Sequence, residues 1–79
     1  MDNETRTRIL KAAEKLETDS KKIGGDKDTA TNHRHIAGIL RKYTKSENWF
    51  KTMYPLAESD SLMHSAKAII DSIESGSRV

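Results

Sequence analysis

Apolar residues recur along the chain at the three- and four-residue spacing of an amphipathic helix. The clearest stripe begins near the start of the chain and consists of Ile9, Ala13, Leu16 and Ile23. Residues at these spacings share one face of a helix with 3.6 residues per turn. Asp2 or Asn3 can cap such a helix, and Gly24-Gly25 can end it. The pattern therefore predicts a first helix over about residues 3–23.

A second apolar cluster predicts a helix over about residues 30–54. Its members are Ile36, Ile39, Leu40 and Tyr43. Phe50, Met53 and Tyr54 fall on or near the same side if the helix continues. A break near 45–46 is left open as an alternative. Pro55 is expected to end the helix, because the residue before a proline is pushed away from the helical region.

A third helix is predicted over about residues 56–75, with a tail at 76–79. Its stripe consists of Leu56, Met63, Ala66, Ile70 and Ile73. Pro55 can open this helix, Asp60 is a later alternative start, and Gly76 stands where a C-terminal cap belongs. No segment alternates with the period of a strand. Residues 1–79 are therefore expected to form one all-α domain, either a small three-helix bundle or a helical hairpin with a docked third helix.

The composition suggests that this core is thin. Of the 79 residues, 34% are apolar and 33% are charged, and there is no cysteine. A chain of this size buries only a modest share of its surface on folding. Without cysteine it cannot be stabilised by disulfide bonds. We therefore expect self-association to complete the core. The chain begins MDNETRTRIL and contains no long apolar run, so we expect no secretory signal, no membrane span and a cytoplasmic location.

The middle of the chain is basic although the net charge is only +2. No acid occurs from Thr29 to Ser46. On a helical wheel, three residues lie within about 40° of Arg34, and a further base lies about 80° away. These are Gly38, Arg41 and Lys45, with Lys42 as the more distant base. A glycine inside a helix costs roughly 1 kcal/mol against alanine, so it can serve the close approach of a phosphate or of another helix. A solvated face is the competing interpretation.

The predicted start of the second helix adds two polar residues to this stripe. Amides and hydroxyls at the positive end of a helix attract anions, although ordinary capping accounts for such residues equally well. The full candidate set for an anion is Thr31, Asn32, Arg34, Gly38, Arg41, Lys42 and Lys45.

Most of the aromatic area of the chain lies close behind the basic stripe. Tyr43, Trp49 and Met53 are candidates for binding a partner, because exposed tryptophan and methionine are typical of interface anchors. On a continuous helix Trp49 would lie about 60° from Arg34, so one surface could use both. The alternative places Trp49 at the centre of the core.

No pattern in the chain indicates catalysis or metal binding. Nucleophile-elbow motifs and cysteine are absent, and His33 and His35 are two residues apart, so they face different ways on a helix. We therefore expect no enzyme, no metal and no cofactor.

Two functions remain. The first is a non-enzymatic helical interaction protein that self-associates and presents the second helix to a protein partner or a phosphate-bearing ligand such as a nucleotide. The second is a nucleic-acid-binding protein, either a non-specific binder of the phosphate backbone or similar to a helix-turn-helix, with Ser46, Asn48 and Lys51 facing the bases. The phosphates would then be held by Arg34, Arg41, Lys42 and Lys45.

Overall fold

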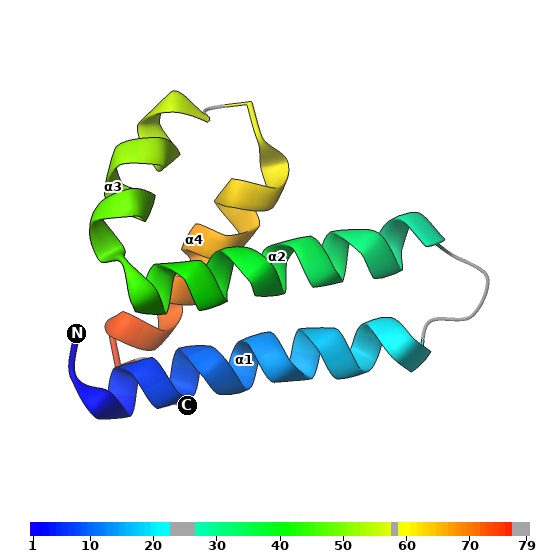
Figure 1. Ribbon diagram of the computed structural model, residues 1–79, viewed down its shortest axis with the longest axis horizontal. Coiled ribbons are helices and arrows are strands. Elements are labelled where there is room, and N and C mark those ends of the chain that lie inside the picture. Colours follow the sequence, from blue (N-terminus) through cyan, green and yellow to red (C-terminus); the bar gives the residue numbers. More distant parts are fainter. Residues whose placement is uncertain (23–26, 58, 77–79) are drawn as a thin grey trace.

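The chain folds into α-helices joined by short connections (Figure 1). The computed structural model describes residues 1–22, 27–57 and 59–76. Within these ranges there is no strand, and the helices are α1 (Asn3–Lys22), α2 (Lys27–Lys45), α3 (Glu47–Leu56) and α4 (Ser61–Glu74). The all-α prediction is confirmed, with one helix more than the three expected.

Side-chain and glycine caps set several helix ends. At α1 the Asp2 carboxylate accepts a hydrogen bond from the amide of Thr5 at 2.7 Å. Hydrogen bonding from Thr5, above all from this amide, lowers the pKa of Asp2. Helix α4 begins at the later of its two predicted starts, because Asp60 is its N-cap. At the other end of α4, Gly76 has a φ of 68° and donates its amide to the Ile73 carbonyl at 3.1 Å. The predicted cap at Gly76 is therefore confirmed.

Ser46 alone separates α2 from α3. Its backbone is extended, with φ −154° and ψ 94°. The Ser46 amide still donates to the carbonyl of Lys42 at 2.9 Å, while its hydroxyl accepts the amide of Trp49 at 3.3 Å. The same residue thus ends one helix and caps the next. The break that the sequence left open near 45–46 is present.

Pro55 does not end the helix before it or open the next one, so that prediction is wrong. It lies inside the last turn of α3, which continues to Leu56. So close to the end of a helix, the missing amide of a proline removes a single hydrogen bond. Leu56 consequently leaves the predicted stripe of the last helix and is 77% exposed. The predictions at Ile23, Gly24-Gly25 and residues 77–79 lie outside the described residues.

The core lies between the α1–α2 hairpin and the shorter helices. Helices α1 and α2 run side by side in opposite directions, and α4 packs against both (Figure 1). Among the described residues, every buried side-chain polar atom has a hydrogen-bond partner. The buried cluster consists of Ile9, Ala13, Ala37, Ile39, Leu40, Tyr43, Phe50, Met63, Ala66 and Ile70.

Candidate functional site

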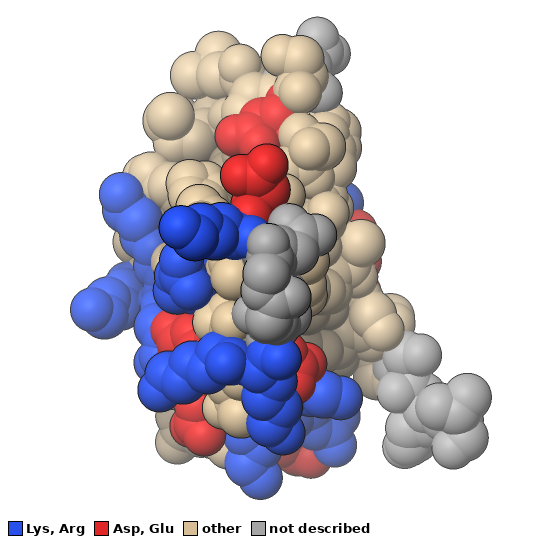
Figure 2. Space-filling view, turned by 90° about the vertical axis from the view of Figure 1, so that its right-hand side faces the viewer, with Lys and Arg blue, Asp and Glu red and all other residues tan. Residues whose placement is uncertain are grey.

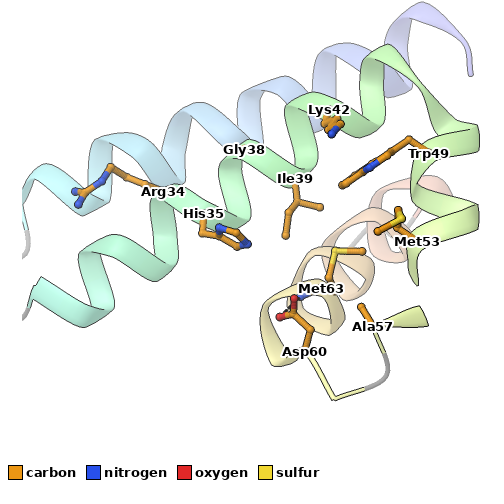
Figure 3. A pocket seen from close by; sticks show the side chains of 10 residues that line it. All are labelled: Arg34, His35, Gly38, Ile39, Lys42, Trp49, Met53, Ala57, Asp60 and Met63. Carbon is orange, nitrogen blue, oxygen red and sulfur yellow. Dashed lines mark hydrogen bonds between the residues drawn. The ribbon is translucent and has the colours of Figure 1, made fainter. Parts of the chain in front are cut away.

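A pocket with a volume of about 500 Å³ lies between α2, α3 and the beginning of α4 (Figure 3). The lining residues are Arg34, His35, Gly38, Ile39, Lys42, Trp49, Met53, Ala57, Asp60 and Met63. Half of them were predicted as binding residues, namely Arg34, Gly38, Lys42, Trp49 and Met53. The pocket thus brings part of the basic stripe together with part of the aromatic segment.

One wall of the pocket is a single face of α2. Arg34, Gly38 and Lys42 are four residues apart in turn, so they follow one another along the helix. His35 and Ile39 form the neighbouring row. Ile39 is only 6% exposed, and the His35 ring points toward the pocket in Figure 3, whereas Arg34 reaches outward at the far end.

The opposite wall comes from α3, because the break at Ser46 turns this helix sharply away from the axis of α2 (Figure 1). Trp49 and Met53, one turn apart, both face the pocket (Figure 3). Trp49 is half-buried, and its ring centre lies 6.2 Å from that of Phe50 in the core. Met53 is 40% exposed, while Met63 of α4 is buried below it. Trp49 therefore packs on the core and also presents a face to the pocket, while its role in binding a partner stays a prediction.

The edge of the pocket along α2 is positively charged. The ammonium of Lys42 lies 4.4 Å from the centre of the Trp49 ring, at a cation–π distance. Within the described residues, neither Lys42 nor Arg34 has a carboxylate in salt-bridge contact. The acid in the lining is Asp60, whose carboxylate accepts the amides of Leu62 and Met63 at 3.0 and 3.3 Å. The two cations are thus available to an anionic ligand.

Arg41 faces away from the pocket, contrary to the expectation that it shares a surface with Arg34. Its guanidinium donates to both carboxylate oxygens of Glu17 on α1, at 2.9 and 2.6 Å. The hydrogen bond from Arg41 is the main cause that lowers the pKa of the Glu17 carboxyl. The bidentate pair fixes Arg41 between α1 and α2 and uses two of its N–H donors.

The other predicted anion ligands do not line the pocket either. Because α2 begins at Lys27, Thr31 and Asn32 lie in its second turn, where backbone amides are bonded within the helix. Thr31 and Asn32 therefore do not stand at the start of the helix, as had been expected, and their part in binding an anion stays a prediction. Thr31 accepts a long hydrogen bond from Arg34, at 3.4 Å. Lys45 is exposed at the last position of α2, beyond the pocket.

Tyr43, which was predicted to bind a partner, lies in the core. Its side chain is 3% exposed, and its ring meets that of Phe50 edge to face at 5.3 Å. Its hydroxyl donates a hydrogen bond to the carboxylate of Glu74. Burial, followed by this hydrogen bond, raises the pKa of Tyr43 well above its usual value.

Replacing Tyr43 by phenylalanine is expected to remove part of the alkaline sensitivity of the fold. Because the folded-state pKa lies above the unfolded value of 10.0, the contribution of Tyr43 is complete below that pH and is lost as pH rises above it. Tyr43→Phe should cost about 1 kcal/mol at neutral pH and flatten the decline at higher pH. Thermal unfolding at about pH 8 and about pH 11 measures this difference. Tyr54→Phe, which removes a hydroxyl bonded to His64 at 2.8 Å, is the matched control.

The arrangement of α2 and α3 differs from the predicted helix-turn-helix. One residue joins the helices, whereas that motif has a turn of three or four residues. Ser46, predicted to face the bases, uses its hydroxyl to cap α3, and Lys51 lies 3.8 Å from Glu47. The hydroxyl of Ser46 is therefore not free to contact a base. The outward face of α3 is also not uniformly basic, because Glu47 lies beside Lys51.

Five lining residues were missed as site residues by the sequence analysis. They are His35, Ile39, Ala57, Asp60 and Met63. Ile39 and Met63 were assigned to apolar stripes, which is correct, but stripe membership alone does not reveal which core side chains reach a pocket. His35 follows Arg34 and stands one turn before Ile39. If a helix break at Ser46 had been assumed, this spacing would have predicted that His35 lines the pocket.

Within the described residues, no group of three or more histidine, cysteine, aspartate or glutamate side chains could hold a metal ion. A search of the same residues found no helix long and apolar enough to cross a membrane. The fold and the pocket define an all-α domain with an apolar pocket edged by cations. Comparisons with known protein families, with curated proteins and with solved structures found no match.

Proposed function

We propose that the chain is a non-enzymatic interaction module whose pocket binds an acidic, amphipathic segment of a partner protein. The observation that carries the proposal is the position of Lys42, which lies over the Trp49 ring at the edge of an apolar pocket. Among the described residues no carboxylate pairs with Lys42. A ligand that places an apolar side chain against Trp49 and a carboxylate beside Lys42 would satisfy both.

The apolar lining supports side-chain docking. Trp49 and Met53 offer a large, partly exposed surface above the buried Met63. Tryptophan is enriched among residues that dominate binding energies, and methionine adapts its shape to different ligands. A volume near 500 Å³ lies within the usual range of ligand pockets and can receive one or two bulky side chains.

The charge pattern favours a protein carboxylate over a long polyanion. On the face seen in Figure 2, basic side chains gather over the part that holds α1 and the start of α2, and acidic side chains stand among them. Several bases are already paired, including Arg8 with Glu4 and Arg41 with Glu17. Nucleic-acid binding usually draws on many phosphate contacts, whereas two cations at a pocket suit one or two carboxylates.

A peptide selection tests this proposal. The full chain would be used to select from a library of random helical peptides, and binding would then be followed by the fluorescence of Trp49, the single tryptophan of the chain. We expect enriched peptides to combine glutamate or aspartate with leucine or phenylalanine, and to shift the emission of Trp49. Enriched peptides without acids, or binding that leaves Trp49 unchanged, would overturn the proposal.

A second experiment distinguishes peptide binding from the alternative function, nucleic-acid binding. A single-stranded oligonucleotide is titrated against the chain at low and at physiological salt. Phosphate binding should weaken steeply with salt because counterions are released. Oligonucleotide affinity above that of the selected peptides, with a steep salt dependence, would favour the nucleic-acid function and contradict peptide docking.

Self-association and a cytoplasmic location stay predictions. The single chain already encloses a core in which Ile9 and Leu40 are fully buried, so a second copy is not needed to complete it. What favours association is the exposed apolar surface of Met53 and Leu56 on α3. Light scattering of the chain at micromolar concentration measures its mass directly.

A further inference from the structure

We infer that the segment received by the pocket is an α-helix that lies along α2 over Gly38 and places two carboxylates against Arg34 and Lys42. This inference rests on the proposed function and specifies the shape of the partner. It follows from three features of the pocket. They are an unexplained glycine, the distance between the two cations, and the lack of a backbone edge that an extended segment could pair with.

Gly38 is not required by the chain itself. It lies inside α2 without a positive φ, and a Cβ added there would meet no atom within 4 Å. A glycine in a helix interior is less favourable than alanine, so the fold alone favours another residue. Gly38 is exposed and lines the pocket. Its missing side chain therefore leaves the α2 backbone open to a neighbour, as glycines at close helix contacts do.

The cations on either side of Gly38 set a spacing for the partner. Arg34 and Lys42 are eight residues apart, which is about 12 Å along a helix. A partner helix close to parallel or antiparallel with α2 spans the same distance in seven or eight residues. Its two acids then lie two turns apart. The residues between them, one turn from each acid, face Gly38 and the apolar wall of Trp49 and Met53.

The walls of the pocket favour a helical partner over an extended one. An extended segment is usually held through its own backbone, by pairing with the edge of a sheet. Here the described residues form no strand, and the lining is made of helices whose backbone groups are bonded internally. At the start of α4 the amides of Leu62 and Met63 are already bonded to Asp60. A helix satisfies its own backbone and needs only side-chain contacts.

Variants of Gly38 test the close approach. Because the added Cβ meets nothing within the chain, Gly38→Ala should raise the midpoint of thermal unfolding by about 4 °C. The same variant should weaken the selected acidic peptides, and Gly38→Leu should weaken them at least about 10-fold by filling the contact. The matched control is Ala68→Leu, which adds a large side chain at an exposed position of α4 outside the pocket. It should leave peptide affinity unchanged.

Two designed peptides of about 18 residues test the helical form. The first carries glutamates seven residues apart with leucines between them on the same face. The second is identical except for one central residue, which is replaced by a proline that breaks the helix. We expect the first to bind at least about 10-fold more tightly than the second. Equal binding of both peptides, or wild-type affinity in Gly38→Leu, would overturn the helical partner while leaving the pocket as a binding site. Failure of every peptide to bind or to change Trp49 emission would instead overturn the proposed function.

Discussion

Replacing Leu40 by alanine is expected to lower the free energy of unfolding by about 3–5 kcal/mol, because it opens a cavity in the middle of the core. Leu40 is fully buried and belongs to the cluster that joins α1, α2 and α4. A chain of this length has about 4–12 kcal/mol of stability in total. The variant should therefore lose a large fraction of the total stability and unfold at a clearly lower urea concentration than the wild type. Urea unfolding followed by circular dichroism measures the loss.

Leu56 provides a matched control for this experiment. It is the same residue type, yet it is 77% exposed at the end of α3. Leu56→Ala should change the free energy of unfolding by less than about 0.5 kcal/mol, as most surface substitutions do. Similar losses in Leu40→Ala and Leu56→Ala would contradict the arrangement in which the end of α3 leaves Leu56 exposed to solvent. A loss only at Leu56 would contradict the core itself.

Reversing the charge at the pocket is expected to abolish binding of the acidic peptides. With Lys42→Glu and Arg34→Glu together, carboxylates of the partner would face carboxylates of the chain, and like charges at an interface cost several kcal/mol. Affinity should fall at least about 100-fold. A peptide with lysines in place of its glutamates should gain affinity for the double variant. Calorimetric titration at two salt concentrations measures both changes without relying on Trp49, whose emission Lys42 itself can alter.

Adjacent residues of α2 supply the control for charge alone. Lys42→Gln and Arg41→Gln each remove one positive charge, so their effects on the overall field are alike. Lys42 lies over Trp49, whereas Arg41 is held by Glu17 on α1. We expect Lys42→Gln to weaken peptide binding about 10-fold and Arg41→Gln to change it less than about twofold. Equal losses would mean that binding depends on net charge and not on the pocket.

The local chemistry of the chain predicted much of the fold. Asp2, Asp60 and Gly76 lie where their capping preferences place them, and the apolar stripes of the first two helices form the core. These features depend on neighbours in sequence, so they can be inferred without the tertiary structure. Pro55 was misjudged because its effect depends on how much helix follows it. With one residue left in α3, the lost hydrogen bond matters little.

The candidate site was only half predictable, because it depends on how helices pack. A helical wheel places Arg41 and Lys42 on either side of Arg34, about 100° apart. The position of α1 decides which of these two side chains contacts a neighbouring helix. The residue that pairs with Arg41 is Glu17 on α1, which lies twenty-four residues away in sequence. Tyr43 was a candidate for both the core and a partner, and only its burial against Phe50 distinguishes them.

Asp60 gives the pocket a direction. Its carboxylate is required at the start of α4, yet it also lines the pocket on the side away from Lys42 (Figure 3). One rim therefore attracts anions and the other repels them. A bound segment is oriented by this asymmetry, with its acidic side toward α2 and a neutral or basic side toward α4. Asp60, the N-cap of α4, thus also determines the orientation in which a ligand can bind.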